Sequence, residues 1–473
     1  MILDRRAPMS VRAVAAVDLG ATSGRVMIGR IGNGRLDLEL VSRFPNGPVQ
    51  REDGLHWDFG SLYDHVVAGL TEAVRREPGI ESIGIDSWAV DYGLLKDGQL
   101  LAEPFHYRDE RSACGIEEVH AIVPFAQLYQ RNGLQFLPFN TLYQYRVDER
   151  LGTADTALLI PDLIAFLLTG AAVAERTNAS TTGLLGVADS EWDTALADRL
   201  GIPSRVLPPL VDPGTTIGRL RPELASTIGK DLPVIAVGSH DTASAVVAAP
   251  LSTPSSAYIS CGTWGLVGVE LPEPVLTEAA RTANFTHELG VDGRYRFLHN
   301  VTGLWLLSET VRAWEAEDEK SIDLPELLRE ASEVPGDVPV FDADDPSLSA
   351  PGDMPSRIAK LLGDDAPTSR PEFARTIVES IAVAFADAVQ TAAYLSGREL
   401  DSIHLVGGGS LNRLLCQATA DRAGLPVLAG PVEATALGNV LVQARALGAA
   451  PATLEELRAV VGATHAPARF DPR

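Results

Sequence analysis

The amino-acid sequence predicts an α/β protein that contains two related domains. Strand-like apolar stretches alternate with helix-like stretches along the chain, and this alternation is typical of α/β folds. A unit of strand, Gly/Thr-containing turn and strand occurs at residues 15–36 and again at residues 257–271. Because both halves of the chain open with this unit, we expect two related domains that face one nucleotide across a cleft.

The length and the charge of the chain restrict the class of protein. Its 473 residues suffice for two or three domains of about 100–200 residues each. The 63 acidic residues outnumber the 39 basic residues and give a net charge of −24. This charge disfavours nucleic acids and anionic membranes as partners. An anionic substrate would need a pocket that is locally basic or lined with amides.

The cysteines and the start of the chain bear on its compartment. Cys114, Cys261 and Cys416 are scattered and form neither a disulfide framework nor a metal-ligand cluster, which is typical of a reducing cytosol. The first ten residues, MILDRRAPMS, contain no apolar segment of the kind found in signal peptides. No apolar run reaches the roughly 18–20 residues of a membrane span. We therefore expect a cytoplasmic protein.

The first glycine-rich turn lies within AAVDLGATSGRVMIGR and follows an apolar strand. No lysine follows Gly20 or Gly24 as in a Walker loop, and the glycine spacing does not match a Rossmann loop. The residues after Gly24 alternate like a strand, which predicts a β-hairpin whose backbone N–H groups and hydroxyls can meet phosphate oxygens. Asp18 ends the first strand, where a carboxylate can hold a hydrated Mg²⁺. An ordinary surface hairpin explains the same pattern.

Three further stretches of the first half support the α/β assignment. Residues 82–95 are predicted to form a buried strand that ends in polar residues, and residues 161–170 a short helix with Pro at its start and Gly at its end. Residues 232–250 indicate a strand, a turn and a helix of small residues. The domain boundary is expected near residues 248–256, which are rich in Pro and Ser.

The second half contains a long helix and a second glycine-rich turn. Apolar residues recur at helical spacing through residues 374–395, which predicts a buried helix. Residues 403–406 form a predicted strand, followed by a tight turn of three glycines at 407–409, with Ser410 as N-cap of the next helix. The inner face of that helix is expected to carry Leu411, Leu414, Leu415 and Ala418. Three glycines let an adenine or ribose lie against backbone, although packing of a strand on a helix explains them equally well.

Taken together, these stretches resemble the FGGY carbohydrate kinases of the actin/hexokinase/Hsp70 superfamily. The resemblance extends from Val17 to Asn439 and narrows to the branch of the family that phosphorylates the ketose L-rhamnulose. The segments that carry it include VDLGATSGRVM, SIGIDSWAVDYGLL, YISCGTWGLVG, VGGGSLNRLLCQ and AGPVEATALGN, and the two with the most weight are LPFNTLYQ and SHDTASAV.

The resemblance implies two related actin-like (ribonuclease H-like) ATPase domains that flank a central cleft. Residues 1–248 would form the domain on the sugar and phosphate side, and residues 249–473 the domain on the nucleotide side. It also implies the reaction ATP + L-rhamnulose → ADP + L-rhamnulose 1-phosphate, with Mg²⁺ as the metal and ATP as co-substrate. The protein would be a monomer or a small homo-oligomer.

The same resemblance assigns roles to individual residues. Asp241, in SHDTAS, would be the general base, although an Asp between a strand and a helix is also a common N-cap. Asp18 would bind the metal through water. The sugar contacts would be Ala89, His240, Asp241, Thr242 and Asn300. The ATP contacts would be Ala21, Thr22, Ser23, Gly24, Arg25, Thr263, Ser308 and Gly408.

Two of these positions depart from the family pattern, and two other functions compete. Relatives commonly carry Gly where this chain has Ala89, and Gln where it has Ser308, which bears on substrate preference and ATP affinity. The first rival function is a kinase for another ketose, such as fuculose or xylulose. The second is a non-catalytic ATP-dependent sugar sensor of the same superfamily, against which Asp241 argues.

Overall fold

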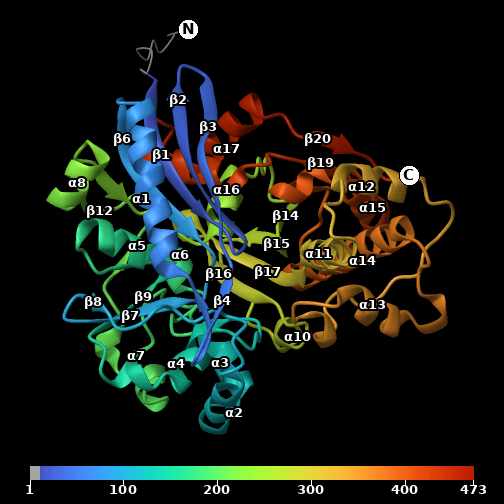
Figure 1. Cartoon of the computed structure of the whole chain (residues 1–473), viewed down its shortest axis with the longest axis horizontal. Coiled ribbons are helices and arrows are strands. Elements are labelled where there is room, and N and C mark those ends of the chain that lie inside the picture. Colours follow the sequence, from blue (N-terminus) through green and yellow to red (C-terminus); the bar gives the residue numbers. More distant parts are fainter. Residues whose placement is uncertain (1–10) are drawn as a thin grey trace. The chain divides into compact units, whose positions relative to one another are not determined.

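The computed structural model describes residues 11–473 (Figure 1). The expectation about a signal peptide concerns residues 1–10 and lies outside the described residues. The chain divides into two compact units that are interleaved in sequence. Unit 1 comprises the residues up to Pro250 together with Leu271–Arg296 and Ala434–Thr464, and unit 2 comprises Leu251–Glu270, Phe297–Glu433 and His465–Arg473. A single division after residue 248 would assign two of the unit 1 segments to the C-terminal domain.

Unit 1 is built on a six-stranded mixed sheet with the order β12-β13-β6-β1-β2-β3. β1 pairs antiparallel with β2 and parallel with β6, and β2 pairs antiparallel with β3. The predicted hairpin in the first glycine-rich segment is therefore confirmed. The strands are β1 (Arg12–Leu19), β2 (Ser23–Gly32), β3 (Arg35–Pro45), β6 (Ile80–Ser87), β12 (Thr216–Arg219) and β13 (Pro233–Ile235).

Helices cover both faces of this sheet. A Cβ on Gly69 of α1 (Phe59–Arg76) would overlap Val26, and a Cβ on Gly29 would overlap Val440 of α16 (Ala434–Ala446). Val26 and Gly29 are three residues apart on β2, so they face opposite sides of the sheet. The sheet is thus enclosed between α1 and α16, which explains why β1 is buried along nearly its whole length.

The prediction of one continuous strand over residues 82–95 is wrong, because the chain changes direction at the centre of this range. β6 ends at Ser87, and β7 (Tyr92–Lys96) belongs to a separate sheet with the order β8-β7-β9. Between them, Val90 adopts a left-handed backbone conformation with a φ of 68°. Such a conformation is unfavourable for a β-branched residue, and nothing in the local sequence signals it.

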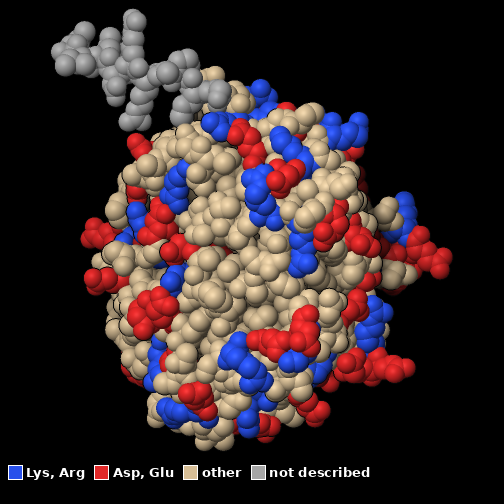
Figure 2. All heavy atoms as spheres, turned by 90° about the vertical axis from the view of Figure 1, so that its left-hand side faces the viewer, with Lys and Arg blue, Asp and Glu red and all other residues tan. Residues whose placement is uncertain are grey.

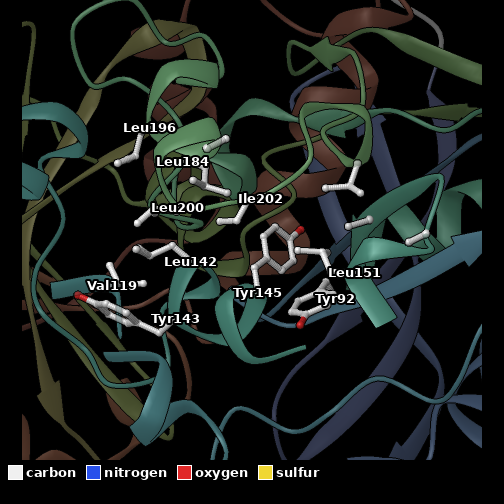
Figure 3. Packing of buried hydrophobic residues seen from close by; sticks show 14 of the residues in the cluster. Tyr92, Val119, Leu142, Tyr143, Tyr145, Leu151, Leu184, Leu196, Leu200 and Ile202 are labelled. Carbon is white, nitrogen blue, oxygen red and sulfur yellow. The ribbon is translucent and has the colours of Figure 1, made fainter. Parts of the chain in front are cut away.

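A hydrophobic core of unit 1 includes side chains from this small sheet (Figure 3). Tyr92 and Tyr145 pack edge to face with ring centroids 4.5 Å apart, next to Leu151. The core draws on β7, β9 (Thr156–Leu159), α2 (Ser112–Ile122), α4 (Thr141–Val147) and α7 (Thr194–Arg199). It fixes the segment that directly follows the left-handed turn at Val90.

The remaining elements of unit 1 include two whose prediction is confirmed. α5 (Ile160–Thr169) ends at Gly170 in a left-handed conformation, and β13 leads into α9 (Asp241–Ala248), as the sequence indicates. The others are β4 (Pro48–Arg51), β5 (Gly54–Trp57), β8 (Gln99–Leu100), α3 (Phe125–Asn132), β10 (Ala174–Glu175), α6 (Arg176–Ala179), β11 (Leu210–Val211), α8 (Pro222–Ile228), α10 (Glu278–Thr282), β16 (Thr286–Leu289) and α17 (Leu454–Thr464).

Unit 2 has its own sheet, in which neighbouring strands follow the order β17-β15-β14-β18-β19-β20. The predicted second hairpin is confirmed, because β14 pairs antiparallel with β15 around Gly262 and Thr263. The strands are β14 (Ser256–Cys261), β15 (Trp264–Leu271), β17 (Tyr295–Thr302), β18 (Ser402–Val406), β19 (Val427–Ala429) and β20 (Ala468–Phe470). The helices are α11 (Trp305–Asp318), α12 (Leu324–Glu333), α13 (Met354–Leu362), α14 (Arg370–Ser396) and α15 (Arg413–Ala423).

The long helix α14 confirms the prediction made from helical spacing. Ser369 and Glu372 form a capping box at its start, and Gly397 ends it in a left-handed conformation. By length and composition α14 is apolar enough to cross a membrane, but 67% of its most apolar stretch is buried inside the protein. Such burial is also what the core helix of a globular domain shows.

The glycine turn after β18 differs from the prediction in one respect. The N-cap of α15 is Asn412, whose side chain accepts a hydrogen bond of 3.1 Å from the amide of Leu415, and not Ser410. The Ser410 hydroxyl instead donates to the Gly407 carbonyl, and residues 408–411 form a 3₁₀ turn. The helix therefore begins later, and Leu411 is exposed while Leu415 and Ala418 are buried.

Candidate active site

Two buried carboxylates lie side by side where β1 and β6 end. Asp18 and Asp86 are direct neighbours in the parallel pairing of these strands, and Arg25 lies opposite Asp18 across the hairpin. The Nε of Arg25 donates to Asp18 Oδ2 at 3.0 Å. Burial raises the pKa of Asp86 well above its usual value, and the charges of Asp18 and Asp241 raise it further. Three carboxyl groups of unit 1 thus act on one another at this edge of the sheet.

Two buried amide side chains of helix α16 form hydrogen bonds with β1 and β6 near these carboxylates. Asn439 donates to Asp86 Oδ2 at 2.6 Å, and Gln443 accepts from Ser82 at 2.7 Å while donating to the Ala15 carbonyl at 3.0 Å. A Cβ on Gly84 would overlap both amides, so the close approach requires glycine there. The stretch AGPVEATALGN contributes to the resemblance, but the sequence analysis assigned no role to Asn439 or to Asp86.

Asp241 lies in the first turn of α9. His240 is the N-cap residue of this helix, and its side chain makes no capping hydrogen bond. Asp241 Oδ1 accepts hydrogen bonds from the amide and the hydroxyl of its neighbour Thr242, at 2.5 and 3.2 Å. Asp241 therefore does not act as the N-cap, which was the alternative interpretation of this residue. Its side chain remains 31% exposed.

The chain just before Asp241 is fixed by a buried glutamate on β10. Glu175 Oε2 accepts hydrogen bonds from the amide and the hydroxyl of Ser239, at 2.9 and 2.7 Å. The same carboxylate accepts from the amide and hydroxyl of Thr177 at the start of α6. Glu175 thus ties the start of α6 to the turn that carries His240 and Asp241. Sequence reasoning missed it, because it lies far from that turn in the chain.

Ala89, one of the two positions that depart from the family pattern, directly follows Trp88, whose ring packs against Trp57. The indole nitrogens of Trp57 and Trp88 both donate to Asp91 Oδ2, at 2.7 and 3.1 Å, and the Trp rings lie 4.1 Å apart. Gln144 donates to the other oxygen of Asp91 at 3.2 Å. Burial raises the pKa of Asp91 to about 6, although the hydrogen bonds that it accepts act in the opposite direction.

The tip of the first hairpin presents Ala21, Thr22 and Ser23 at a partly exposed turn. The turn is closed by a hydrogen bond of 3.0 Å from the Gly20 amide to the Ser23 carbonyl. A Cβ on Gly24 would overlap the ring of Phe44 on β3. Gly24 is therefore required for packing of the hairpin, whereas the residues at its tip are partly exposed.

Unit 2 carries four of the expected site residues. Thr263 lies in the β14–β15 turn, and its carbonyl accepts from the amide of Trp305 at 3.1 Å, which places the start of α11 beside the turn. Ser308 is an exposed residue of the first turn of α11. Asn300 is half-buried on β17. These residues are placed within unit 2 by itself.

Two neighbouring glycines in the glycine turn of unit 2 have different environments. A Cβ on Gly409 would overlap the thiol of Cys261, so this glycine serves packing. Gly408, the predicted nucleotide contact, is exposed and has open space where a Cβ would project. The surface of Gly408 is therefore accessible to a flat ligand.

Among residues 11–473, no group of three or more His, Cys, Asp or Glu side chains is arranged to hold a metal ion by itself. Asp18 and Asp86 supply carboxylate oxygens, which suit Mg²⁺ better than nitrogen or sulfur donors would. Asp86 Oδ1 is buried and has no hydrogen-bond partner in the described part of the chain. These two residues fit an ion that takes its other ligands from water and phosphate.

Sequence comparison places the chain in a family of kinases. Residues 13–248 match the N-terminal domain of the FGGY family of carbohydrate kinases, and residues 257–447 match its C-terminal domain. The chain therefore belongs to this family and is an ATP-dependent carbohydrate kinase. It is 39% identical to a rhamnulokinase of Bacteroides thetaiotaomicron over 92% of this chain and 91% of that protein. It is 40% identical to a rhamnulokinase of Klebsiella pneumoniae over 98% and 95%.

Solved structures agree on the fold. A gluconate kinase from Lactobacillus acidophilus matches with a TM-score of 0.78 and 19% identity over 98% of this chain and 94% of that chain. A xylulose kinase from Rhodospirillum rubrum matches with a TM-score of 0.76 and 22% identity, with the same coverage. The prediction of a two-domain actin-like α/β fold is confirmed.

Proposed function

We propose that this carbohydrate kinase transfers the γ-phosphoryl group of ATP to L-rhamnulose and forms L-rhamnulose 1-phosphate and ADP, a step of L-rhamnose catabolism. The observation that supports this substrate most is the identity of about 40% to rhamnulokinases over nearly the whole of both chains. The intact Asp241 in the first turn of α9 favours a kinase over a non-catalytic sugar sensor.

The chemical step has two requirements that residues of this chain must meet. Phosphoryl transfer proceeds mainly through positioning and charge stabilisation, with an acceptor group near the attacking hydroxyl. The hydroxyl oxygen of the sugar forms the new O–P bond, the bond between the γ-phosphorus and the bridging oxygen breaks, and Asp241 takes the hydroxyl proton. Because the contacts of Asp241 with Thr242 involve Oδ1, we expect Oδ2 to accept this proton.

The remaining site residues have positioning roles in this proposal. Arg25 and the tip of the first hairpin, Ala21–Ser23, would meet phosphate oxygens, and Thr263, Ser308 and Gly408 would contact the nucleotide. His240, Thr242, Asn300 and Ala89 would surround the sugar. Asp18 and Asp86 would hold Mg²⁺, which neutralises the charge that develops on the transferred group.

One assay tests the substrate. Purified enzyme with ATP and Mg²⁺ is given L-rhamnulose, L-fuculose or D-xylulose, and ADP release is measured against sugar concentration. We expect kcat/KM to be highest for L-rhamnulose and turnover to be lost on chelation of divalent metal. A higher kcat/KM with another of these ketoses would refute the substrate assignment, and ATP binding without ADP release for any of them would favour the sensor. We expect a cytoplasmic enzyme, in keeping with its three free cysteines.

A further inference from the structure

A buried ion pair lies directly behind His240, on the side away from Asp241. Arg296, the last residue of the unit 1 segment Leu271–Arg296, is fully buried, and Glu288 on β16 of the same segment is 6% exposed. The Nη2 of Arg296 lies 3.0 Å from Glu288 Oε2 and 2.9 Å from the Nδ1 of His240. A second hydrogen bond of 3.2 Å, from Nε to the Leu289 carbonyl, holds the guanidinium in place.

Burial of this ion pair costs free energy, so its presence in the core needs an explanation. Removing two charges from water costs several kcal/mol per ion, and apolar residues of the same volume often stabilise a core equally well. Burial would raise the pKa of Glu288, but the charge of Arg296 outweighs it, so the pKa is lowered and the carboxylate is ionised. Stability alone therefore does not explain why these two charged side chains are buried here.

The contact between Arg296 and His240 fixes the position of a proton. A guanidinium has N–H donors and no acceptor, so at 2.9 Å the His240 Nδ1 must accept with its lone pair. A neutral imidazole that accepts at Nδ1 carries its proton on Nε2. The Nε2 of His240 lies 3.4 Å from Asp241 Oδ1. The imidazole thus turns an N–H, and not a lone pair, toward the carboxylate.

Glu288 competes for the same ring nitrogen and would give the opposite result. Its Oε2 lies 3.2 Å from Nδ1, and a hydrogen bond from a protonated Nδ1 to this oxygen would leave the Nε2 lone pair facing Asp241. In the structure Oε2 accepts no hydrogen bond of good geometry, whereas Arg296 donates to Nδ1. Arg296 therefore decides which nitrogen of His240 carries the proton, and Glu288 holds Arg296 in place.

We propose that Arg296 and Glu288 are positioning residues that fix the Nε2–H tautomer of His240 and thereby orient the carboxylate of Asp241. A donor at Nε2 attracts Asp241 Oδ1 across the 3.4 Å that separate them, which leaves Oδ2 for the sugar hydroxyl. A lone pair at Nε2 would repel the carboxylate and compete with it for the proton. The effect on catalysis rests on the proposed function, whereas the tautomer is a property of the protein alone.

The test is NMR of protein labelled with ¹⁵N-histidine, recorded without sugar or ATP. The chain has nine histidines, and the signals of His240 are assigned from their loss in His240→Gln. We expect a protonated Nε2 and an unprotonated Nδ1 in the native enzyme and in Arg296→Lys, since lysine also only donates. A His240 protonated at Nδ1 in the native enzyme would overturn the proposal, whatever the substrate proves to be.

A double variant extends the test to catalysis. Arg296→Met with Glu288→Met replaces both charges by apolar side chains and leaves no unpaired ion in the core. We expect a mixture of the two His240 tautomers and a kcat about 10–100-fold lower, with KM for the sugar changed less. Arg131→Met breaks the Arg131–Asp193 ion pair of unit 1 and serves as the matched control, with the tautomer and kcat unchanged. An unchanged tautomer and kcat in the double variant would overturn the positioning role.

Discussion

Asp241 is the residue that we propose as the proton acceptor. Its Oδ1 is occupied by hydrogen bonds from Thr242, and the side chain is partly exposed at the start of α9. The sequence left open whether this residue caps the helix or accepts a proton. Because His240, and not Asp241, occupies the N-cap position, we expect a substitution of Asp241 to have little effect on the stability of helix α9.

We expect Asp241→Asn to lower kcat by about 10²–10⁴-fold while sugar binding is largely retained. Asparagine keeps an oxygen that can accept from Thr242, but it cannot take the hydroxyl proton. The measurements are kcat, KM for the ketose and the melting temperature of the same variant. A folded Asp241→Asn enzyme that keeps most of its kcat would show that another group is the base.

Asp91 offers a second test at the scale of one residue, through pH. Its pKa is raised from the unfolded value of about 3.9 to about 6 in the fold, so the folded state binds the proton more tightly. The stabilisation that this causes is fully present below pH 4 and is lost as the pH rises through 6.

We therefore expect the unfolding free energy of the native enzyme, minus that of Asp91→Asn, to fall by about 2 kcal/mol between pH 4 and pH 7. Asparagine does not titrate, so the difference isolates the carboxyl group from the other ionisable groups. Denaturant unfolding at several pH values measures it. A difference that is constant with pH, or that rises, would contradict the raised pKa.

At the scale of secondary-structure elements, the site depends on side chains that join distant segments. Glu175 on β10 holds the turn before α9, and Asn439 and Gln443 on α16 hold the ends of β1 and β6. Each of these contacts replaces water at a buried polar group, so loss of one partner leaves the other unsatisfied. The elements are therefore positioned by a few polar contacts within an otherwise apolar core.

We expect Glu175→Gln to lower the unfolding free energy by about 1–3 kcal/mol, because the new amide nitrogen would face the Ser239 or Thr177 donors. The turn that carries His240 and Asp241 should loosen, which raises KM for the sugar. Unfolding curves and steady-state kinetics of the same protein give both numbers. Glu191→Gln, at a side chain that is 60% exposed, is the control. Equal behaviour of the two variants would mean that Glu175 does not fix the turn.

The elements also show what the sequence can and cannot predict. Both hairpins, α5, α9 and α14 follow from local periodicity and from Pro and Gly at helix ends, and they are confirmed. The left-handed Val90 was missed, because valine seldom adopts that conformation and tertiary contacts impose it. Glu175, Glu288 and Arg296 were missed because each acts on residues far away in sequence and belongs to no local motif. Asn439 ends a stretch that carries the resemblance, but its contact with Asp86 appears only in the fold. Resemblance identified the residues expected to touch ligands, and only the structure identified those that hold them.

At the scale of the whole molecule, the surface charge of the protein is not sufficient to attract ATP to its site. On the face drawn in Figure 2, Lys and Arg side chains are interspersed with Asp and Glu. The net charge of −24 opposes a polyphosphate. We therefore expect recognition of ATP to depend on local donors, for which we propose Arg25 and backbone amides, and to respond weakly to the overall charge of the surface.

The interleaving of the two units leads to a prediction about fragments of the chain. Unit 1 needs α16, which lies more than 180 residues after Pro250 in the sequence and covers one face of β1, β2 and β6. Val440 packs at Gly29, and a Cβ on Gly438 would overlap the Ser244 carbonyl of α9, so the helix fits closely against both sheet and α9. Without α16, Asp86 would also lose Asn439, its buried hydrogen-bond donor.

We therefore expect a fragment of residues 1–250 to fail to fold cooperatively, although it contains all of residues 13–248, which match the N-terminal family domain. The apolar face of its sheet would be exposed to water, and the fragment should aggregate or bind a hydrophobic dye without a sharp thermal transition. Co-expression with residues 251–473 supplies α16 and should restore soluble protein that melts like the intact chain. Calorimetry of the fragment, the co-expressed pair and the full chain makes the comparison. A fragment that melts cooperatively on its own would show that α16 is dispensable, and that the domain boundary at residue 248 describes an independent folding unit.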